Sequence, residues 1–496
     1  MTSPLHNTDF YKVDHRRQYP EGTEMVFSNW TARKSRLSGV DKVVFFGLQA
    51  YLLNHLQSKW QHDFFEMDVE DVVGKYHQRI SGAGIAISTE HIQYLHSLGY
   101  LPLEIWALPE GTHVPIGVPM FVMWNTDPKC FWLTNYIETS MSANIWGTCT
   151  SATLASRYRG VLDLYAKMTG GDPDFVDWQG HDFSYRGMYG DEAAALSGAG
   201  HLTSFLGTDT IPAIDLVHDC YTSPVLGLYT DSGLAISEFI GGSVAATEHS
   251  VMCMGTKGGE LETFRRLITE VYPTGIVSIV SDTWDYWRIL TEVMPALKDE
   301  IMARDGKVVL RPDSGDPVDI ICGDKRLEHG TPANLGTMRL LLETFGGTRT
   351  KRGFMQLDPH VGAIYGDSIT LERCEQICQR LTSHGIVPSM VLGIGSYTYQ
   401  MVTRDTFGFA LKSTAGIVNG EVREIFKDPV TDDGTKRSAK GFTAVYKDGT
   451  EELYLTDEMS LEHVRNCSFQ EVFRDGRVFN LTNITQVRDN VVKGRM

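Results

Sequence analysis

A guanidinium group, two carboxylates and a hydroxyl follow directly on a short apolar run near residue 310. The run at residues 307–310 is typical of a buried strand, and it is followed by Arg311, Asp313, Ser314 and Asp316. Ligands of α/β enzymes bind where parallel strands end, at their carboxyl termini. Arginine can hold a phosphate through two hydrogen bonds, and aspartate can accept from sugar hydroxyls or bind Mg²⁺. This stretch therefore predicts a ligand site, with an ordinary Pro-Asp-Ser-Gly turn as the alternative.

The same pattern recurs along the middle of the chain. Five more apolar runs end at polar or glycine-rich tips, at residues 207–209, 247–250, 281–282, 366–368 and 393–396. Helical patterns such as 259–270 and 368–380 lie between several of them. Strand, polar tip and helix in alternation predict a parallel α/β barrel or a doubly wound sheet. Since the tips of parallel strands meet at one edge, we expect one polar pocket, and an enzyme rather than a binding module.

The two ends of the chain differ from the middle in their pattern of expected strands and turns. Short strand-like runs separated by turns predominate in residues 1–145 and return after about residue 405, where Asp448-Gly449 predicts a hairpin. We therefore predict an irregular parallel α/β barrel domain at residues 146–405. The segments 1–145 and 406–496 are expected to combine into a second α/β lobe.

Composition excludes several classes of protein. The chain has 496 residues, 42% hydrophobic and 22% charged, which is typical of a globular protein with a large core. The net charge of −17 argues against nucleic-acid binding, because phosphate backbones need basic surfaces. The eight cysteines form no C-x-x-C pair, as in reduced cytosolic proteins. The sequence shows neither a signal peptide nor an apolar stretch long enough to span a bilayer, so we expect a cytoplasmic protein without membrane contact.

Other segments carry side chains suited to a flat or anionic ligand. Phe183 stands close to Arg186, and an aromatic ring can stack on a heterocycle while arginine holds an anion. His249 follows an expected strand tip, although most histidines are neither ligands nor catalysts. Lys427 and Lys436 stand in a basic loop, which is either solvated or the place where a polyphosphate binds.

Nine short motifs, taken in order, resemble those of the nicotinamide phosphoribosyltransferases, which are type II phosphoribosyltransferases. They lie at residues 11–20, 181–187, 207–210, 248–250, 280–282, 311–315, 366–367, 403–405 and 426–430. The resemblance runs from about residue 9 to 441. One such motif is weak evidence, whereas nine in order are highly specific.

The resemblance implies an activity and its partners. Members of this family form nicotinamide mononucleotide and pyrophosphate from nicotinamide and phosphoribosyl pyrophosphate (PRPP) in NAD salvage. It also implies Mg²⁺, held mainly by PRPP and pyrophosphate, and ATP as a coupled substrate. A homodimer with shared active sites is expected, in which Tyr11 and Asp9 come from the other subunit.

The resemblance assigns one group of residues to the nicotinamide. Phe183 and Tyr11 are expected to sandwich the pyridine ring, with Arg186 and Ser278 close by. Asp209 is expected to accept a hydrogen bond from the carboxamide NH₂. Because a carboxylate at this position repels nicotinate, Asp209 favours the amide over the acid.

A second group is assigned to ribose, phosphates and catalysis. Arg311 and Asp313 are expected to hold the ribose and phosphates, with Asp282 beside them. His249 matches the histidine that ATP phosphorylates in this family. Further phosphate contacts are assigned to Gly366, Asp367, Gly395, Ser396, Arg404, Arg33, Lys427 and Lys436.

One departure from the family and three other hypotheses remain. Animal members have a longer glycine run where this chain has Ser396 and Tyr397, so side chains stand in the phosphate loop. A nicotinate-using relative is one alternative, against which Asp209 argues. An unrelated barrel enzyme, such as a metal-dependent lyase, would need no PRPP. A non-catalytic nucleotide-binding or signalling protein is the third, and the intact set of polar tips argues against it.

Overall fold

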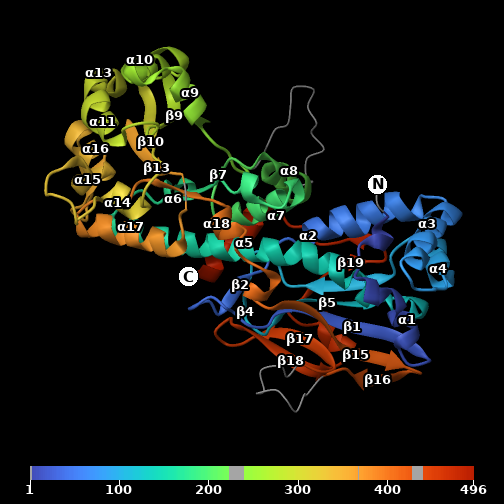
Figure 1. Ribbon diagram of the computed structural model, residues 1–496. Helices are drawn as coiled ribbons and strands as arrows, with labels where there is room; N and C mark the ends of the chain where they lie inside the picture. Colours follow the sequence, from blue (N-terminus) through green and yellow to red (C-terminus); the bar gives the residue numbers. More distant parts are fainter. Residues whose placement is uncertain (1–2, 223–238, 367, 427–438, 496) are drawn as a thin grey trace, which may run out of the picture. The chain divides into compact units, whose positions relative to one another are not determined.

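The computed structural model describes residues 3–222, 239–366, 368–426 and 439–495 (Figure 1). The chain divides into two compact units. Unit 1 consists of Met1–Thr153, Leu216–Glu238 and Val402–Met496, and unit 2 of Leu154–Asp215 and Phe239–Met401. The middle of the chain thus makes one unit and its two ends make the other. The sequence predicted one domain at residues 146–405. It did not predict that the segment Leu216–Glu238, within these limits, belongs to unit 1.

Unit 2 is built on a seven-stranded parallel sheet in the order β7-β6-β14-β13-β10-β9-β8. Its strands are β6 (Gly180–Asp182), β7 (Gly207–Thr208), β8 (Ala245–Ala246), β9 (Thr274–Val280), β10 (Asp305–Arg311), β13 (Val361–Tyr365) and β14 (Val391–Ile394). The sheet curls, because Gly207 on one edge strand bridges Gly242, just before the other edge strand. The predicted parallel α/β barrel is confirmed, in an irregular form.

Burial explains why the central strands read as continuous apolar runs. All five residues of β13 are buried, as are Val308, Val309 and Leu310 of β10. Strands of a parallel sheet are covered on both faces, so they do not alternate apolar with polar residues. Strands β9, β10 and β13 lie side by side (Figure 1).

Helices connect these strands. The main ones are α7 (Asp191–His201), α9 (His249–Met254), α10 (Glu260–Arg266), α14 (Pro317–Cys322), α16 (Thr337–Phe345), α17 (Leu371–Ser383) and α18 (Ser396–Tyr399). Helix α17 buries Cys374, Ile377, Cys378 and Leu381, which repeat on one face at helical spacing. The two cysteines are therefore core residues.

One expected strand is absent from its place. The run 203–206, Thr-Ser-Phe-Leu, was expected to form a strand, but it forms a turn and an irregular link after α7, and β7 begins at Gly207. The backbone N–H of Phe205 donates to the carbonyl of His201, at 3.2 Å, instead of pairing with a neighbouring strand. This helix-like hydrogen bond occupies a backbone N–H that a strand would need for pairing with its neighbour.

Unit 1 contains an antiparallel sheet in the order β16-β15-β1-β5-β3-β19-β20. Its strands are β1 (Thr23–Ala32), β3 (Leu103–Ala107), β5 (Pro119–Asn125), β15 (Phe409–Val418), β16 (Glu421–Glu424), β19 (Gln470–Arg474) and β20 (Arg477–Val478). The inner strand β1 pairs with β15, from Thr23 opposite Val418 to Ala32 opposite Phe409. Both ends of the chain therefore build one sheet, and the predicted second lobe is confirmed.

Aromatic packing and helices complete unit 1. The fully buried Trp30 stacks on Phe121 and on Phe409, with ring centroids 5.9 and 5.5 Å apart. The predicted hairpin is present, since β17 (Phe442–Lys447) pairs with β18 (Leu453–Met459). Further elements are β2 (Lys42–Val44), β4 (His113–Pro115), α2 (Leu48–Tyr51), α3 (Val69–Gly82), α4 (Glu90–Leu98), α19 (Leu461–Arg465) and α20 (Ile484–Arg495).

Two helices, α5 (Leu133–Thr169) and α8 (Ile211–Tyr221), contribute residues to both units. Among the described helices, none combines the length and the hydrophobicity that crossing a membrane requires.

Candidate active site

Three predicted catalytic side chains meet at the strand tips of unit 2. Asp282 follows β9, Asp313 follows β10, and His249 follows β8 as the first residue of α9. The Nε2 atom of His249 lies 3.3 Å from an Asp313 oxygen and 3.9 Å from Oδ1 of Asp282. Its Nδ1 atom lies 3.1 Å from the hydroxyl of Thr283.

Asp282 organises the loop after β10. Its Oδ2 atom accepts from the backbone N–H of Asp313 at 3.0 Å and from the hydroxyl of Ser314 at 2.6 Å. The side chain is only 4% exposed, and its Oδ1 atom has no hydrogen-bond partner among the described residues. A buried carboxylate oxygen without a partner is costly, so this atom is suited to a bound ligand or ion.

The electrostatics of this cluster favour a cation. Burial and then the charge of Asp282 raise the pKa of Asp313, although the imidazole of His249 acts in the opposite direction. The ligand atoms of His249, Asp282 and Asp313 all lie within 4.8 Å of one another. Two carboxylates so close together repel each other, and a positive charge between them removes that repulsion.

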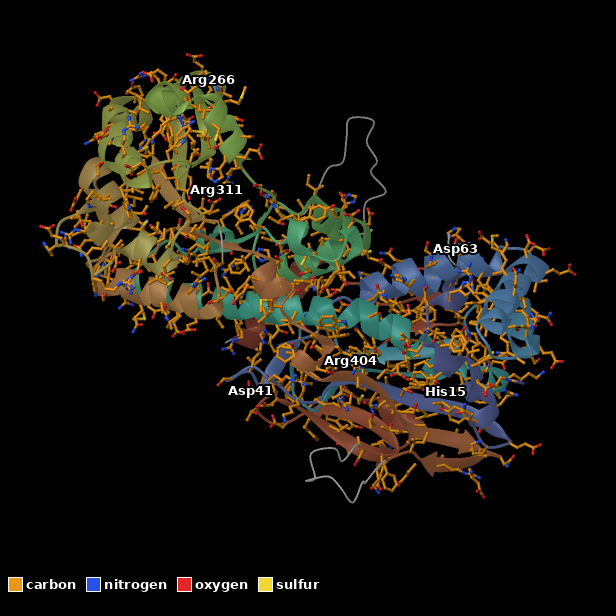
Figure 2. All side chains as sticks on the ribbon, viewed as in Figure 1. His15, Asp41, Asp63, Arg266, Arg311 and Arg404 are labelled. Carbon is orange, nitrogen blue, oxygen red and sulfur yellow. The ribbon has the colours of Figure 1, made fainter. Side chains whose placement is uncertain are left out.

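Arg311 stands at the carboxyl end of β10 (Figure 2). One of its terminal nitrogens, Nη2, donates to the carbonyl of Thr247 at 2.6 Å, which fixes the guanidinium in place. Its Nε atom is buried and has no partner among the described residues, and the same holds for the hydroxyl of Ser278 on β9. Two buried donors on neighbouring strands thus remain available for an acceptor on a ligand.

A second polar group forms around Asp209, directly after β7. His181 lies on the neighbouring strand β6, and its Nε2 atom lies 2.8 Å from Oδ1 of Asp209. The hydroxyl of Ser243 donates to the same oxygen at 2.5 Å. Burial raises the pKa of Asp209, but the hydrogen bonds from His181 and Ser243 outweigh it, so the pKa lies below its usual value. Asp209 is therefore a carboxylate that can accept but not donate at neutral pH.

Phe183 stands just after β6, beside this carboxylate. Its backbone N–H donates to the carbonyl of Ile394 at 3.0 Å, and its ring packs against His181 with centroids 4.5 Å apart. A Cβ at Gly393 would lie 2.7 Å from the phenyl ring, so only glycine leaves room for this ring position. Arg186 follows on the exposed turn η6 (Tyr185–Gly187).

The expected phosphate residues of unit 2 also lie at strand tips. Gly366 follows β13, and its N–H donates to the carbonyl of Pro312 at 3.3 Å. Gly395 and Ser396 follow β14 at the start of α18. The side chain of Ser396 packs so closely on Gly187 that a Cβ at that glycine would overlap it. Asp367, Lys427 and Lys436 lie outside the described residues.

Two predicted site residues stand near the N-terminus in unit 1. Tyr11 belongs to the turn η2 (Phe10–Asp14), and its side chain is 60% exposed. Asp9 caps this turn and accepts from the hydroxyl of Thr139 at 2.7 Å. The buried Lys12 pairs with Glu138, so the segment is fastened to α5 on both sides of Tyr11.

The two predicted phosphate-binding arginines of unit 1 lie on neighbouring segments. Arg33 donates from Nε to the carbonyl of Gly408 at 2.9 Å. Arg404 (Figure 2) begins the turn η10 (Arg404–Thr406), whose last carbonyl accepts from the backbone N–H of Arg36 at 2.9 Å. Segments far apart in the sequence thus lie next to each other, and each carries one of the two arginines.

Two polar contributors were missed by reasoning from the sequence. No role was predicted for His181 or Ser243, although both contact Asp209. A signal for His181 did exist, because residues two apart in an extended segment share a face, which pairs His181 with Phe183. Ser243 stands between strand elements and carries no such signal.

Comparisons with known proteins identify the fold and the family. Among solved structures, a nicotinate-nucleotide pyrophosphorylase from Pyrococcus furiosus matches with a TM-score of 0.57 and 13% identity, covering 99% of this chain and 95% of that one. Human nicotinic acid phosphoribosyltransferase matches with a TM-score of 0.52 and 15% identity, covering 99% and 94%. The model of the nicotinate phosphoribosyltransferase family matches residues 178–475. Fold and site thus define a type II phosphoribosyltransferase.

Sequence relatives narrow this class. The N-terminal domain model of nicotinamide phosphoribosyltransferase matches residues 3–67. Nicotinamide phosphoribosyltransferase of Acinetobacter baylyi is 51% identical, covering 99% of this chain and 97% of its own. The enzymes of the same name from Mycoplasma pneumoniae and Xanthomonas campestris are 33% and 32% identical, covering 87% and 99% of this chain and 93% and 98% of their own. The chain belongs to the nicotinamide phosphoribosyltransferase family.

Proposed function

We propose that this protein transfers the phosphoribosyl group of PRPP to nicotinamide, forming nicotinamide mononucleotide and pyrophosphate in NAD salvage. The observation that carries the proposal is the carboxylate of Asp209 beside the ring of Phe183. A carboxylate held ionised by two donors accepts from the NH₂ of a carboxamide and repels the carboxylate of nicotinate. Family membership supports the same base.

The base site is completed by the two unpaired donors. The ring of nicotinamide stacks on Phe183, and its NH₂ donates to Asp209. Its carbonyl oxygen needs donors, and the buried Arg311 Nε and Ser278 Oγ have no partner among the described residues. Arg186 stands on the exposed turn that follows Phe183.

The reaction exchanges one bond for another at C1′ of the ribose. The bond from C1′ to the pyrophosphate oxygen breaks as the ring nitrogen of nicotinamide forms its bond to C1′. The nitrogen attacks as a neutral nucleophile, so no strong general base is needed. Asp313 accepts from the ribose hydroxyls and Arg311 balances phosphate charge, so the residues act by positioning and by electrostatics.

The cluster at the strand tips fits the Mg²⁺ that the family implies. Asp282 Oδ1 is a buried oxygen without a described partner, and Asp313 lies next to it with a raised pKa. Mg²⁺ binds one or two carboxylates together with substrate phosphates, and Asp282 and Asp313 would supply them. When bound, it neutralises the charge that develops on the pyrophosphate.

We further propose that His249 accepts the γ-phosphoryl group of ATP. Its side chain is 47% exposed, and its two ring nitrogens face different partners, Thr283 and Asp313. The hydroxyl of Thr283 fixes the ring, which leaves Nε2 as the nucleophile. The bond from Nε2 to the γ-phosphorus forms as the bond from that phosphorus to the β,γ-bridging oxygen breaks, so ADP leaves. The ring proton, which is on Nδ1, passes to solvent.

A homodimer in the cytoplasm completes the proposal. Tyr11 presents an exposed ring from a segment fastened on both sides, which suits a ring that reaches into a partner subunit.

The phosphates of the substrates would be bound by backbone N–H groups and by guanidinium groups. The residues that supply them are Gly366, Gly395, Ser396, Arg33 and Arg404.

The test is a product analysis. The purified protein is incubated with PRPP, Mg²⁺ and either nicotinamide or nicotinate, with and without ATP, and the products are identified by mass spectrometry. We expect nicotinamide mononucleotide from the amide alone, in larger yield with ATP. The acid mononucleotide would instead support the nicotinate-using alternative, and no product from either base would refute the proposed reaction.

A further inference from the structure

Asp209 is held by two donors that come from separate segments of unit 2. His181 lies on β6, and Ser243 lies in the segment between Gly242 and β8, while Asp209 itself follows β7. We infer that His181 and Ser243 are positioning residues that set the amide specificity of the site, by fixing Asp209 in one orientation with its second oxygen directed to the base. This inference rests on the proposed function.

The direction of the two hydrogen bonds follows from the chemistry of the groups. An ionised carboxylate only accepts, so the Nε2 atom of His181 and the hydroxyl of Ser243 must both donate. Both bonds end on Oδ1 of Asp209, at 2.8 and 2.5 Å. Among the described residues, none donates to Oδ2. One oxygen is therefore saturated by the protein, and the other remains for the carboxamide NH₂ of the substrate.

Burial separates the fixed donor from the accessible acceptor. His181 is 7% exposed and its ring packs against Phe183, whereas the side chain of Asp209 is 43% exposed. The donor thus cannot turn away, and it lies against the ring that stacks on the base. A backbone bond from the Asp209 N–H to the carbonyl of Asp182, at 3.0 Å, holds the main chain of the acceptor to β6 as well.

Loss of the donors has a definite chemical consequence. A carboxylate without them rotates more freely and takes up a proton more readily, because charge-assisted hydrogen bonds favour its ionised form. A protonated Asp209 offers a donor to the carboxylate of nicotinate, and a rotated Asp209 is a poorer acceptor for the amide. The preference for the amide should therefore decline although Asp209 itself is unchanged.

The test separates the hydrogen bond from the bulk of the imidazole. His181→Phe keeps a ring against Phe183 but cannot donate, whereas His181→Gln loses the ring but keeps a donor. Ser243→Ala removes the second donor. The matched control is His360→Phe, because His360 makes a histidine–aspartate hydrogen bond of the same 2.8 Å length, to Asp358, elsewhere in unit 2.

Binding of nicotinamide and of nicotinate is measured by calorimetry, followed by KM and kcat for both bases. We expect His181→Phe to weaken nicotinamide about 10- to 100-fold, as for loss of a hydrogen bond to a charged group. The kcat at saturating nicotinamide should change less than KM, and the preference over nicotinate should fall. His181→Gln should stay within about threefold of the unchanged protein, Ser243→Ala should fall between the two, and His360→Phe should have no effect.

Two results would overturn the inference. One is unchanged affinity for both bases in His181→Phe. The other is an equal loss in the Phe and Gln variants with a lowered melting temperature, which would show a packing role only. If the unchanged protein binds nicotinamide but forms no mononucleotide, the proposed reaction fails, while the calorimetric comparison of the variants still decides the role of His181.

Discussion

At the scale of single residues, the site is marked by buried polar atoms whose partners are not found in the described chain. Ser278 Oγ, Arg311 Nε and Asp282 Oδ1 all lie on or directly after two neighbouring strands, β9 and β10. Each such atom costs about 1–3 kcal/mol when it stays unpaired. A folded chain that retains three of them at adjacent strand tips is adapted to a ligand with both donors and acceptors.

Substitution of Asp209 tests which substituent of the pyridine ring is recognised. Asp209→Asn replaces an acceptor-only group by one that also donates, so nicotinate should no longer be repelled. We expect the ratio of kcat/KM for nicotinamide over nicotinate to fall at least about tenfold. Competition between the two bases, with products separated by mass spectrometry, measures this ratio. Full retention of the amide preference would contradict the role given to Asp209.

Ser278 allows stability and binding to be separated. Because its hydroxyl is buried without a described partner, Ser278→Ala should leave the melting temperature unchanged or higher. The KM for nicotinamide should rise about 5- to 30-fold, since the carboxamide oxygen loses a donor.

The control for this variant is Ser204→Ala. Ser204 is a second serine of unit 2 whose buried hydroxyl has no described partner, but it lies in the turn before β7. We expect the same effect on stability with no effect on KM. Equal KM values for the Ser278 and Ser204 variants would remove Ser278 from the base site.

At the scale of elements, the site depends on close contacts between the turn η6 and helix α18. Gly187 ends η6, and Ser396 is the first residue of α18. A methyl group at residue 187 would overlap the side chain of Ser396 and push α18 away from β14. Ser396 therefore requires a glycine at residue 187.

This contact predicts a compensating pair of substitutions. Gly187→Ala should raise the KM for PRPP, by about tenfold if the overlap costs 1–2 kcal/mol. The double variant with Ser396→Gly should recover most of the loss, because the overlapping atoms are removed. Steady-state kinetics with PRPP as the varied substrate measures both, and a double variant no better than the single one would contradict the contact.

The same scale shows what a sequence can reveal. Strands β10 and β13 were predicted because a buried parallel strand is a continuous apolar run that ends at a polar tip. Strand β6 was not, since its three residues, Gly180, His181 and Asp182, include two polar side chains. The expected strand at 203–206 was wrong because apolar residues also fill buried turns. A strand of two or three residues is too short to show a hydrophobic periodicity, so its sequence does not predict it.

The site residues also include some that a local sequence pattern predicts and others that it does not. Arg311, Asp282, Asp313 and His249 were predicted as site residues because each stands where an apolar run ends. Their mutual distances, and the pairing of Asp209 with Ser243, depend on how strands order in space, which no local pattern encodes. Tertiary hydrogen bonds were therefore the part that only the structure could supply.

At the scale of the whole molecule, buried histidines link stability to pH. Burial lowers the pKa of His91, His113 and His201 from 6.5 to about 4. The unfolded chain binds protons at these positions below pH 6.5, whereas the folded protein stays neutral there until about pH 4. Acidification through this window therefore favours unfolding, and above pH 7 the contribution is constant.

We expect the melting temperature to fall steeply between pH 6.5 and 4.5, with each histidine contributing at most about 3 kcal/mol. His113→Gln keeps a donor for the carbonyl of Val491, to which the His113 ring is hydrogen-bonded, but does not titrate. The melting temperature of this variant should fall less on acidification, by the contribution of the one histidine removed. An identical acid sensitivity of variant and unchanged protein would contradict the assignment of His113.

The proposed shared site makes a quantitative prediction for mixed dimers. Tyr11→Ala and Asp313→Ala should each be nearly inactive. When the two are unfolded and refolded together, half of the dimers are mixed, and each mixed dimer has one intact site. About a quarter of the activity of the unchanged protein should return, as for random pairing in a two-fold dimer. No recovery on mixing would place Tyr11 outside the partner's site.

The pairing of β1 with β15 also determines the order in which the protein can be built. The ribosome releases β1 and its neighbour β5 early, but β15 emerges nearly 400 residues after β1. Unit 2 ends at Met401, so all of its strands leave the ribosome before β15 does. Because domains fold as units during synthesis, the barrel of unit 2 can fold first. One edge of β1 stays unpaired until the last fifth of the chain has been synthesised. A nascent chain stalled in that fifth would carry an ordered barrel and an open sheet edge, which is the form that chaperones must protect from aggregation.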